Sequence, residues 1–246
     1  MNARNVLPFL RRVKAFCLDL LFPRAACCLC CGHPRLASEK DCLCDACREK
    51  LKFFRIPAQA CERCLSPVEK GRPCAFCHSP AMKPVERVFS PYIYGGEVRQ
   101  LIHQLKFNAC EDALPLLAVP MADSLKRRDF DCLVPVPLHP RRLRQRGFNQ
   151  TLLLCRAVSA ETGLPVAELL RRVRYHRPQS LTARQDRSKN VLGAFVSSGQ
   201  IEGLRILLVD DVRTTGSTAR ACAEALLSAG AASVSLLTAA VVYRRK

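Results

Sequence analysis

The chain has 246 residues, of which 49% are hydrophobic, and it carries 39 lysines and arginines against 21 aspartates and glutamates. This length and apolar content suit a soluble globular protein with one large domain, or a medium-sized domain with a small addition. The formal net charge of +18 favours polyanionic partners such as nucleic acid, phosphorylated small molecules or an anionic membrane surface. No stretch approaches the ~18 consecutive apolar residues of a membrane-spanning helix, which excludes that class.

The N-terminal segment 1–24 is basic and partly apolar. Arg11, Arg12, Lys14 and Asp19 interrupt its apolar residues before they reach the length that a signal peptide needs. The apolar residues follow a helical spacing, so we expect an N-terminal helix over 1–24 that packs on the rest of the protein, with contact to a membrane surface as the alternative. Without a signal or a membrane span, a cytoplasmic location is expected.

Twelve of the sixteen cysteines lie before Ser79, and eight of them form four Cys-x-x-Cys pairs. Two residues between two thiolates let both sulfurs bind one ion from a tight turn, so two such pairs complete a tetrahedral zinc site. We therefore predict a double zinc ribbon over residues 25–80 with two structural Zn²⁺ ions. The predicted ligands are Cys28, Cys31, Cys44, Cys47, Cys61, Cys64, Cys74 and Cys77.

Redox motifs, iron–sulfur ligation and reduced buried cysteines are the alternatives for these pairs, although a redox motif usually occurs singly. Joining the first pair with the second and the third with the fourth is the simplest arrangement, and an interleaved arrangement stays open. A site with four thiolates has no open position, so these metals are expected to hold the fold and not to do chemistry. The neighbouring residues that offer alternative ligands are Cys27, Cys30, Cys42, His33 and His78.

The remainder, predicted as one domain over residues 85–246, alternates strands and helices. Asn149 and Gly163 mark the two ends of one helix, and apolar residues at helical spacing mark another over 96–107. Such alternation predicts an α/β fold, a parallel sheet with helices on both faces. In chain order we expect a strand over 87–96, helices over 96–107 and 113–126, a strand over 131–137, a helix over 148–163, a strand over 203–211, a helix over 217–230 and a strand over 232–243.

The stretch LLVDDVRTTGST, residues 207–218, places two carboxylates where a strand is predicted to end and small residues before a helix. Ligands of open α/β sheets bind at the carboxyl ends of the strands, and a helix N-terminus favours phosphate. Backbone N–H groups and hydroxyls are offered there by Thr214, Thr215, Gly216, Ser217 and Thr218. The sequence thus predicts a site for a sugar phosphate, with an ordinary strand, turn and capped helix as the alternative.

This stretch resembles the phosphoribosyl pyrophosphate (PRPP) loop of type I phosphoribosyltransferases. The resemblance implies that Asp210 and Asp211 contact the ribose hydroxyls of PRPP and that residues 214–218 hold its 5′-phosphate. Arg213 stands where the motif usually has an apolar residue. As a loop residue it is expected to point to solvent or toward a polyanion, and nothing assigns it a catalytic role.

Four more stretches occur in a fixed order: LLFPRAACCLCCG, LIHQLKF, DCLVPVPLHPRRLRQRGFNQ and RPQSLTARQDRSKNVLGAF. Together with the PRPP loop they resemble the ComF family, also called the GntX or amidophosphoribosyltransferase-like family, over about residues 20–241. The resemblance implies a pyrophosphate-side turn at PVPLHPRR and a flexible catalytic hood over 175–190. The residues it implies for binding are Arg141, Arg142 and Arg146 in the turn, unless they are solvated surface arginines, and Gln179, Arg187 and Asn190 in the hood.

The resemblance implies transfer of a phosphoribosyl group from PRPP, with Mg²⁺ bridging the pyrophosphate and the ribose hydroxyls, to an acceptor that the sequence does not reveal. Two other functions are open: a non-catalytic competence factor that binds single-stranded DNA, and a regulator that senses PRPP or a nucleotide. The family is associated with DNA uptake and natural transformation, which implies competence proteins as partners. The aromatic content of 6% and the absence of tryptophan argue against binding DNA by base stacking.

Overall fold

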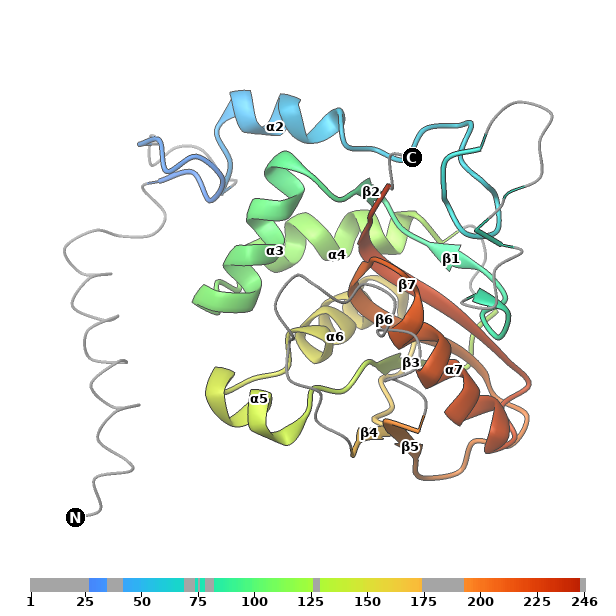
Figure 1. The fold of residues 1–246 in the computed structure, drawn as a ribbon. Helices are drawn as coiled ribbons and strands as arrows, with labels where there is room; N and C mark the ends of the chain where they lie inside the picture. The colour runs from blue at the N-terminus through green and yellow to red at the C-terminus, as the bar shows by residue number, and fades with distance from the viewer. Residues whose placement is uncertain are drawn as a thin grey trace, which may run out of the picture.

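The structure is a computed structural model that describes residues 27–34, 42–68, 74, 76–77, 82–125, 129–173 and 193–243 (Figure 1). The helix expected over 1–24 and the hood expected over 175–190 lie outside these ranges. Within them, no helix has both the length and the apolar character needed to cross a membrane.

A parallel sheet forms the centre of the molecule. β6 (Arg205–Arg213) and β7 (Ser233–Val241) lie side by side in its middle, with Leu208 opposite Leu236. β3 (Cys132–Pro135) pairs with β6, and two short strands, β1 (Val88–Phe89) and β2 (Tyr92–Ile93), pair with β7. The central strands are almost continuous apolar runs because a parallel sheet is covered on both faces.

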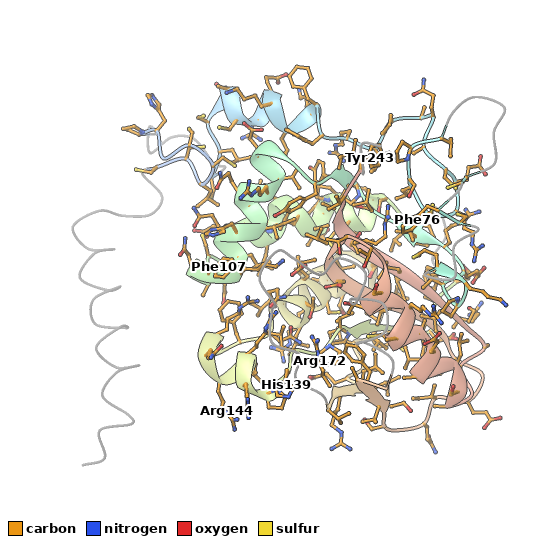
Figure 2. The ribbon with its side chains drawn as sticks, in the orientation of Figure 1. Phe76, Phe107, His139, Arg144, Arg172 and Tyr243 are labelled. Atoms are coloured by element: carbon orange, nitrogen blue, oxygen red, sulfur yellow. The ribbon has the colours of Figure 1, made fainter. Side chains whose placement is uncertain are left out.

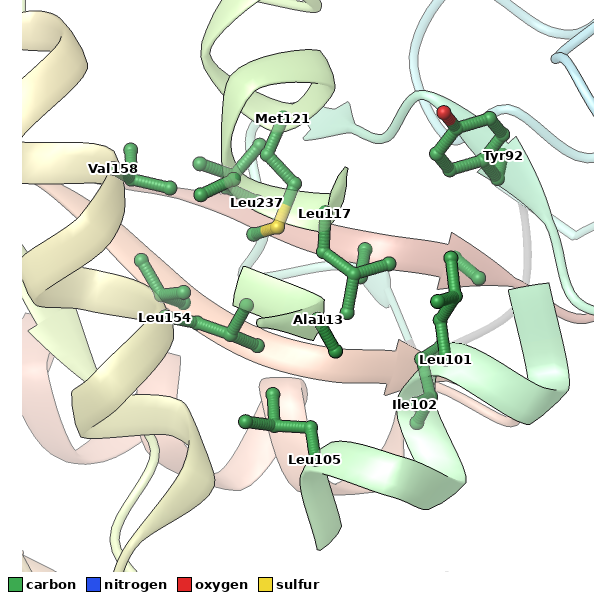
Figure 3. Close-up of a cluster of buried hydrophobic side chains, with 14 of the residues drawn as sticks. Tyr92, Leu101, Ile102, Leu105, Ala113, Leu117, Met121, Leu154, Val158 and Leu237 are labelled. Atoms are coloured by element: carbon green, nitrogen blue, oxygen red, sulfur yellow. The ribbon is translucent and has the colours of Figure 1, made fainter. Parts of the chain in front are cut away.

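Helices cover both faces of this sheet, as the alternation of elements predicts (Figure 1). On one face, α3 (Gly96–Asn108), α4 (Ala113–Asp123) and α6 (Gln150–Thr162) enclose a core that includes Leu207 and Val209 of β6 (Figure 3). On the other, α7 (Ser217–Ser228) and the hairpin of β4 (Leu170–Arg172) and β5 (Phe195–Ser197) enclose a core with Ile206 and Leu208. Successive side chains of β6 point to opposite faces of the sheet and so belong to two separate cores.

Local sequence signals account for several element ends. The Asn149 side chain accepts a hydrogen bond from the N–H of Thr151 at 3.2 Å and caps α6, which ends at Gly163 with a φ of 76°. The four apolar residues that predict α3 are all at most 1% exposed: Val98, Leu101, Ile102 and Leu105.

The eight predicted cysteine ligands gather in two groups. We call Cys28, Cys31, Cys44 and Cys47 the first cysteine cluster, and Cys61, Cys64, Cys74 and Cys77 the second cysteine cluster. A helix that the sequence did not predict, α2 (Asp45–Lys52), packs the first cluster on α3, and buried residues of the two clusters join different cores. The division of the chain near residues 80–85 stays a prediction.

The strand expected over 87–96 is interrupted. β1 and β2 flank Ser90 and Pro91, because proline has no N–H to donate and the Ser90 hydroxyl donates to the carbonyl of Tyr92 at 3.3 Å. Residues 54–56, which link the two clusters, pair with this edge: the N–H of Ile93 donates to the Phe54 carbonyl at 2.6 Å. The link between the cysteine clusters therefore forms an isolated antiparallel bridge with the edge of the sheet, between Arg55 and Tyr92.

Candidate phosphoribosyl site

The two aspartates of the predicted PRPP loop lie near the carboxyl end of β6. Asp211 is 6% exposed, and its Oδ2 lies 2.8 Å from Nζ of Lys106 and accepts a hydrogen bond from Nε2 of Gln150 at 2.8 Å. Among the described residues its Oδ1 has no such contact. The structure thus holds one carboxylate in a fixed orientation and leaves it one acceptor oxygen.

Asp210 has a different environment. Burial, and then the charge of Asp211, raise the pKa of its carboxyl to about 7, although the Asp211 N–H and the charges of Lys106 and Arg172 act in the opposite direction. A carboxyl that titrates near neutral pH is often functional, since burial of this kind is arranged where a ligand later supplies compensating charge. The pair therefore combines one ion-paired carboxylate with one that protonates readily.

The small-residue loop leads from β6 into α7 as predicted. Gly216 adopts a left-handed conformation with a φ of 80°, which other residues rarely adopt, and it precedes the first turn of the helix. Oγ1 of Thr215 lies 2.8 Å from Oγ of Ser217 and accepts a hydrogen bond from its N–H at 3.3 Å. No residue outside the loop caps this helix N-terminus within the described chain, so the N–H groups that follow Ser217 in the first turn remain available to an anion.

The predicted pyrophosphate-side arginines lie on a helix and not in a turn. α5 (Pro140–Arg146) begins where His139 accepts a hydrogen bond from the N–H of Arg141 at 3.1 Å, and it ends at Gly147. Arg146 donates to Oε1 of Gln150 and so joins the network of Asp211, while Arg141 is exposed and Arg142 is half-buried. The structure brings one of the three arginines to the acidic pair.

Three residues beside the acidic pair were not assigned by the sequence. Lys106 and Gln150 stand in the LIHQLKF and FNQ stretches, so the signal was present without a role attached to it. The Arg172 guanidinium lies 5.4 Å from the ring centre of Phe195, and its Nε is buried without a hydrogen-bond partner among the described atoms (Figure 2). An unsatisfied buried donor near Asp210 is a candidate contact for an anionic ligand.

We expect Lys106→Met to destabilise the protein by about 1–3 kcal/mol, because it leaves the carboxylate of Asp211 without its cation. The measurement is urea unfolding at pH 7.5. In the matched control, Lys52→Met removes the exposed ion pair with Glu49 and should change the free energy of unfolding by less than about 0.5 kcal/mol. Equal effects of the two substitutions would contradict the assignment of Lys106 as the partner of Asp211.

The two cysteine clusters have the geometry of metal sites. In each, the four sulfurs lie within 4.8 Å of one another. The Cys31–Cys44 sulfur distance is 3.7 Å, and both the Cys61–Cys77 and the Cys64–Cys74 distances are 3.5 Å. Tetrahedral zinc with bonds of about 2.3 Å places its sulfurs roughly 3.8 Å apart, so the donors fit that ion.

This geometry follows the simpler arrangement of the cysteine pairs, the first with the second and the third with the fourth. Cys30 donates instead to the Glu97 carbonyl at 3.6 Å, and Cys27, Cys42 and His33 also lie outside both clusters. His78 is not among the described residues.

Arg213 is the residue whose expected environment was wrong. It is 3% exposed and does not point to solvent, because β6 continues two residues beyond Asp211 and the Arg213 carbonyl accepts a hydrogen bond from the N–H of Val242 at 2.9 Å. As a strand residue, Arg213 directs its side chain to a face of the sheet that is covered by other residues. The guanidinium Nη2 donates to the Cys64 carbonyl at 3.1 Å and to the Ser66 hydroxyl at 3.4 Å, and the guanidinium lies 4.7 Å from the ring centre of Phe76.

A parallel sheet between helices, with an acidic pair and a small-residue loop at its carboxyl edge, defines a protein of the phosphoribosyltransferase fold, and residues 150–246 match the phosphoribosyl transferase domain family. The DNA utilization protein YhgH of Escherichia coli (strain K12) is 32% identical over 201 residues, which cover 78% of this chain and 87% of that protein. The competence protein ComFC of Bacillus subtilis (strain 168) is 27% identical over 205 residues, 80% and 82% of the two chains. The chain belongs to the ComF family.

Solved structures match more weakly. The allosteric regulatory enzyme of purine biosynthesis has a TM-score of 0.33 at 23% identity over 48% of this chain, which spans only 23% of that enzyme. The adenine phosphoribosyltransferase from Thermoanaerobacter pseudethanolicus has a TM-score of 0.34 at 17% identity, over 56% of this chain and 82% of the other. Scores this low carry nothing about the site.

Proposed function

We propose that the protein binds PRPP with Mg²⁺ at the carboxyl end of β6 and transfers its phosphoribosyl group to an acceptor still to be identified, in the cytoplasm. The observation that carries the proposal is the acidic pair, with its two different environments, directly before a small-residue loop that opens into the N-terminus of α7. The match to the phosphoribosyl transferase domain family supports it.

Each part of the site has a role in this reaction. The acidic pair accepts hydrogen bonds from the ribose hydroxyls, and the loop N–H groups and hydroxyls hold the 5′-phosphate with the help of the helix dipole. As pyrophosphate leaves the anomeric carbon, the sugar gains oxocarbenium character, which the carboxylates stabilise. Nearby arginines stabilise the departing charge; those we propose are Arg146 and Arg172, with Arg141 and Arg142 from α5.

Mg²⁺ prefers carboxylate, hydroxyl and phosphate oxygens, and the oxygens of the acidic pair fit that preference. When bound, it neutralises the pyrophosphate of the substrate. The predicted hood residues Gln179, Arg187 and Asn190 remain predictions for closing this site. Two Zn²⁺ ions in the cysteine clusters complete the proposal, as ions that hold the fold because four thiolates leave no open position.

Calorimetry of PRPP with Mg²⁺ tests the proposal. We expect Asp211→Asn to weaken PRPP binding by about 10- to 100-fold, because a charged hydrogen bond contributes roughly 1.5–3 kcal/mol. In the matched control, Asp131→Asn removes a carboxylate beside the opposite end of β6, where it pairs with Arg205, and should leave affinity unchanged. Equal affinity in both variants and the wild type would remove the site assignment. Pyrophosphate release over a panel of bases and amines then tests turnover.

The second candidate is a non-catalytic protein that binds single-stranded DNA. It is favoured by Phe107, which is 64% exposed at the end of α3 (Figure 2). The ring centre of Phe107 lies 4.5 Å from that of His103, with the two planes tilted by 39°, and 5.4 Å from the Arg146 guanidinium. An exposed aromatic ring beside a cation suits a stacked base. A salt series of oligonucleotide binding tests this function, and flat salt dependence would contradict phosphate contacts.

A further inference from the structure

The strand that leads into the proposed phosphate loop ends in a buried cation. Arg213 is 3% exposed, and within the described ranges no carboxylate lies at ion-pair distance from it and its Nε has no hydrogen-bond partner. A guanidinium stays protonated in proteins, so its burial is costly unless negative charge compensates it. Among the described residues, that charge therefore has to come from another kind of group.

The second cysteine cluster lies next to this guanidinium. The contacts of the guanidinium are the carbonyl of Cys64, the hydroxyl of Ser66 and the ring of Phe76, all within the segment 61–77 that carries the cluster. Thiolate is the form of cysteine that binds metal, and four thiolates around one Zn²⁺ carry a net charge of about −2. Metal at the second cysteine cluster therefore places negative charge beside the buried cation.

The backbone of Arg213 leads directly into the loop. Its carbonyl is held by the N–H of Val242, at the end of β7, and the next residue, Thr214, begins the loop that reaches the left-handed Gly216. The side chain and the backbone of one residue therefore fasten the start of the loop to the second cluster and to the sheet. The first cluster has no comparable connection among the described residues, since it packs on α3.

We propose that Arg213 is a positioning residue that couples metal binding at the second cysteine cluster to the order of the loop 214–218. Metal at that cluster holds the loop in one conformation, and loss of the metal releases it. Metal at the first cluster has no such effect. The coupling is a property of the fold; its consequence, that PRPP affinity depends on the second metal, rests on the proposed function.

Hydrogen–deuterium exchange of peptides that cover 213–218 tests the coupling without any ligand. We expect Cys74→Ser to lower the metal content from two ions to one and to raise exchange in the loop by about tenfold or more. Cys31→Ser should also lose one ion but leave loop exchange within about twofold of the wild type. Equal loop exchange in the two cysteine variants would overturn the proposal, because both lose one metal.

Substitution of the arginine tests the same link from the other side. We expect Arg213→Met to weaken metal binding at the second cluster by about tenfold in competition with a chromogenic chelator, which corresponds to loss of one hydrogen-bonded charge. Loop exchange should rise in this variant, and Arg213→Lys should restore part of both properties. The matched control is Arg205→Met, which removes an exposed arginine from the opposite end of β6 and should change neither. Unchanged metal affinity and loop exchange in Arg213→Met would also overturn the coupling.

Two further measurements allow a conclusion if Arg213→Met does not fold, or if the wild type does not bind PRPP. If Arg213→Met fails to fold, Ser66→Ala removes a single contact of the guanidinium and should shift metal affinity and loop exchange in the same direction by a smaller factor. Unchanged values in Ser66→Ala together with a folded, unaffected Arg213→Lys would contradict the proposal. PRPP calorimetry on the same variants separates the two ideas: a wild type that does not bind PRPP defeats the proposed function, while the exchange data still decide the coupling.

Discussion

Removing the metals with a strong chelator under reducing conditions is expected to lower the melting temperature by more than about 10 °C. A structural zinc site contributes roughly 10–16 kcal/mol of apparent binding free energy in isolated peptides, whereas a whole domain has only about 5–15 kcal/mol of stability. In this protein Cys28, Cys47 and Cys64 are at most 3% exposed, so their clusters are parts of the two cores. Loss of about 5 kcal/mol corresponds to roughly 10–20 °C for a chain of this length.

Calorimetric melting with and without chelator, together with the metal content by mass spectrometry, measures this effect. We expect two ions per chain before chelation. Cys27→Ser is the control, because Cys27 is an exposed cysteine outside both clusters and its loss should leave two ions and an unchanged melting temperature. An equal melting temperature with and without chelator, or a metal content below two ions per chain in Cys27→Ser, would contradict the ligand assignment.

The second large effect is expected from Asp210→Asn, which should stabilise the protein at pH 8 while it abolishes PRPP binding. The folded pKa of about 7 lies above the usual carboxyl pKa of 3.8, so the folded state binds the proton more tightly than the unfolded state. The contribution of this group to stability therefore falls as pH rises from about 4 to about 7. Asparagine resembles the neutral acid and avoids that loss, which we place at about 1–2 kcal/mol, or roughly 3–6 °C, after allowance for partial exposure.

Other charged groups near Asp210 do not change this sign. Asp211 on the same strand raises the pKa of Asp210, whereas Lys106 of α3 and Arg172 of β4 lower it without reversing the effect of burial. The nearby thiol of Cys222 in α7 has its own pKa raised by burial and by the charge of Asp210. Melting temperatures at pH 5 and pH 8 measure the prediction. Asp131→Asn should behave in the opposite way, because hydrogen bonds from Arg205 lower the pKa of Asp131 and that variant loses stability at pH 8. A destabilised Asp210→Asn at pH 8 would contradict the assigned environment.

Wild-type affinity for PRPP should rise with pH through about 7, because the ionised form of Asp210 is the better acceptor for the ribose hydroxyls. A gain in stability combined with a loss of binding is typical of residues that a fold retains for function.

Much of the fold was predictable because its signals are local. The ends of α6 follow from Asn149 and Gly163, and α3 follows from apolar residues three and four positions apart. Helix α5, PRRLRQR, has no buried residue, so no apolar period marks it. Only its ends carry a signal: His139 before it, Pro140 at its first position and Gly147 after it. The position of Asp210 and Asp211 near the carboxyl end of a strand was likewise predictable, because an apolar run stops at two carboxylates.

The rest of the site depends on contacts between residues distant in the chain. Lys106 and Gln150 reach Asp211 only because α3 and α6 pack on the same face of the sheet. Arg213 was misplaced for a related reason: two aspartates suggested that the strand had ended, whereas β6 continues to pair with β7 as far as Arg213 and Val241. The residue whose carbonyl accepts from Arg213, Cys64, lies nearly 150 residues earlier in the sequence, so no local signal marks this contact.

The order of the strands also bears on how the protein is made. β7, which pairs with β1, β2 and β6, follows every other strand in the chain, so a growing polypeptide lacks the middle of its sheet until residues 233–241 have left the ribosome. The cysteine-rich segments emerge long before the surfaces on which they pack. During synthesis, those thiols are therefore free to take up the proposed metals before the domain that buries them has folded.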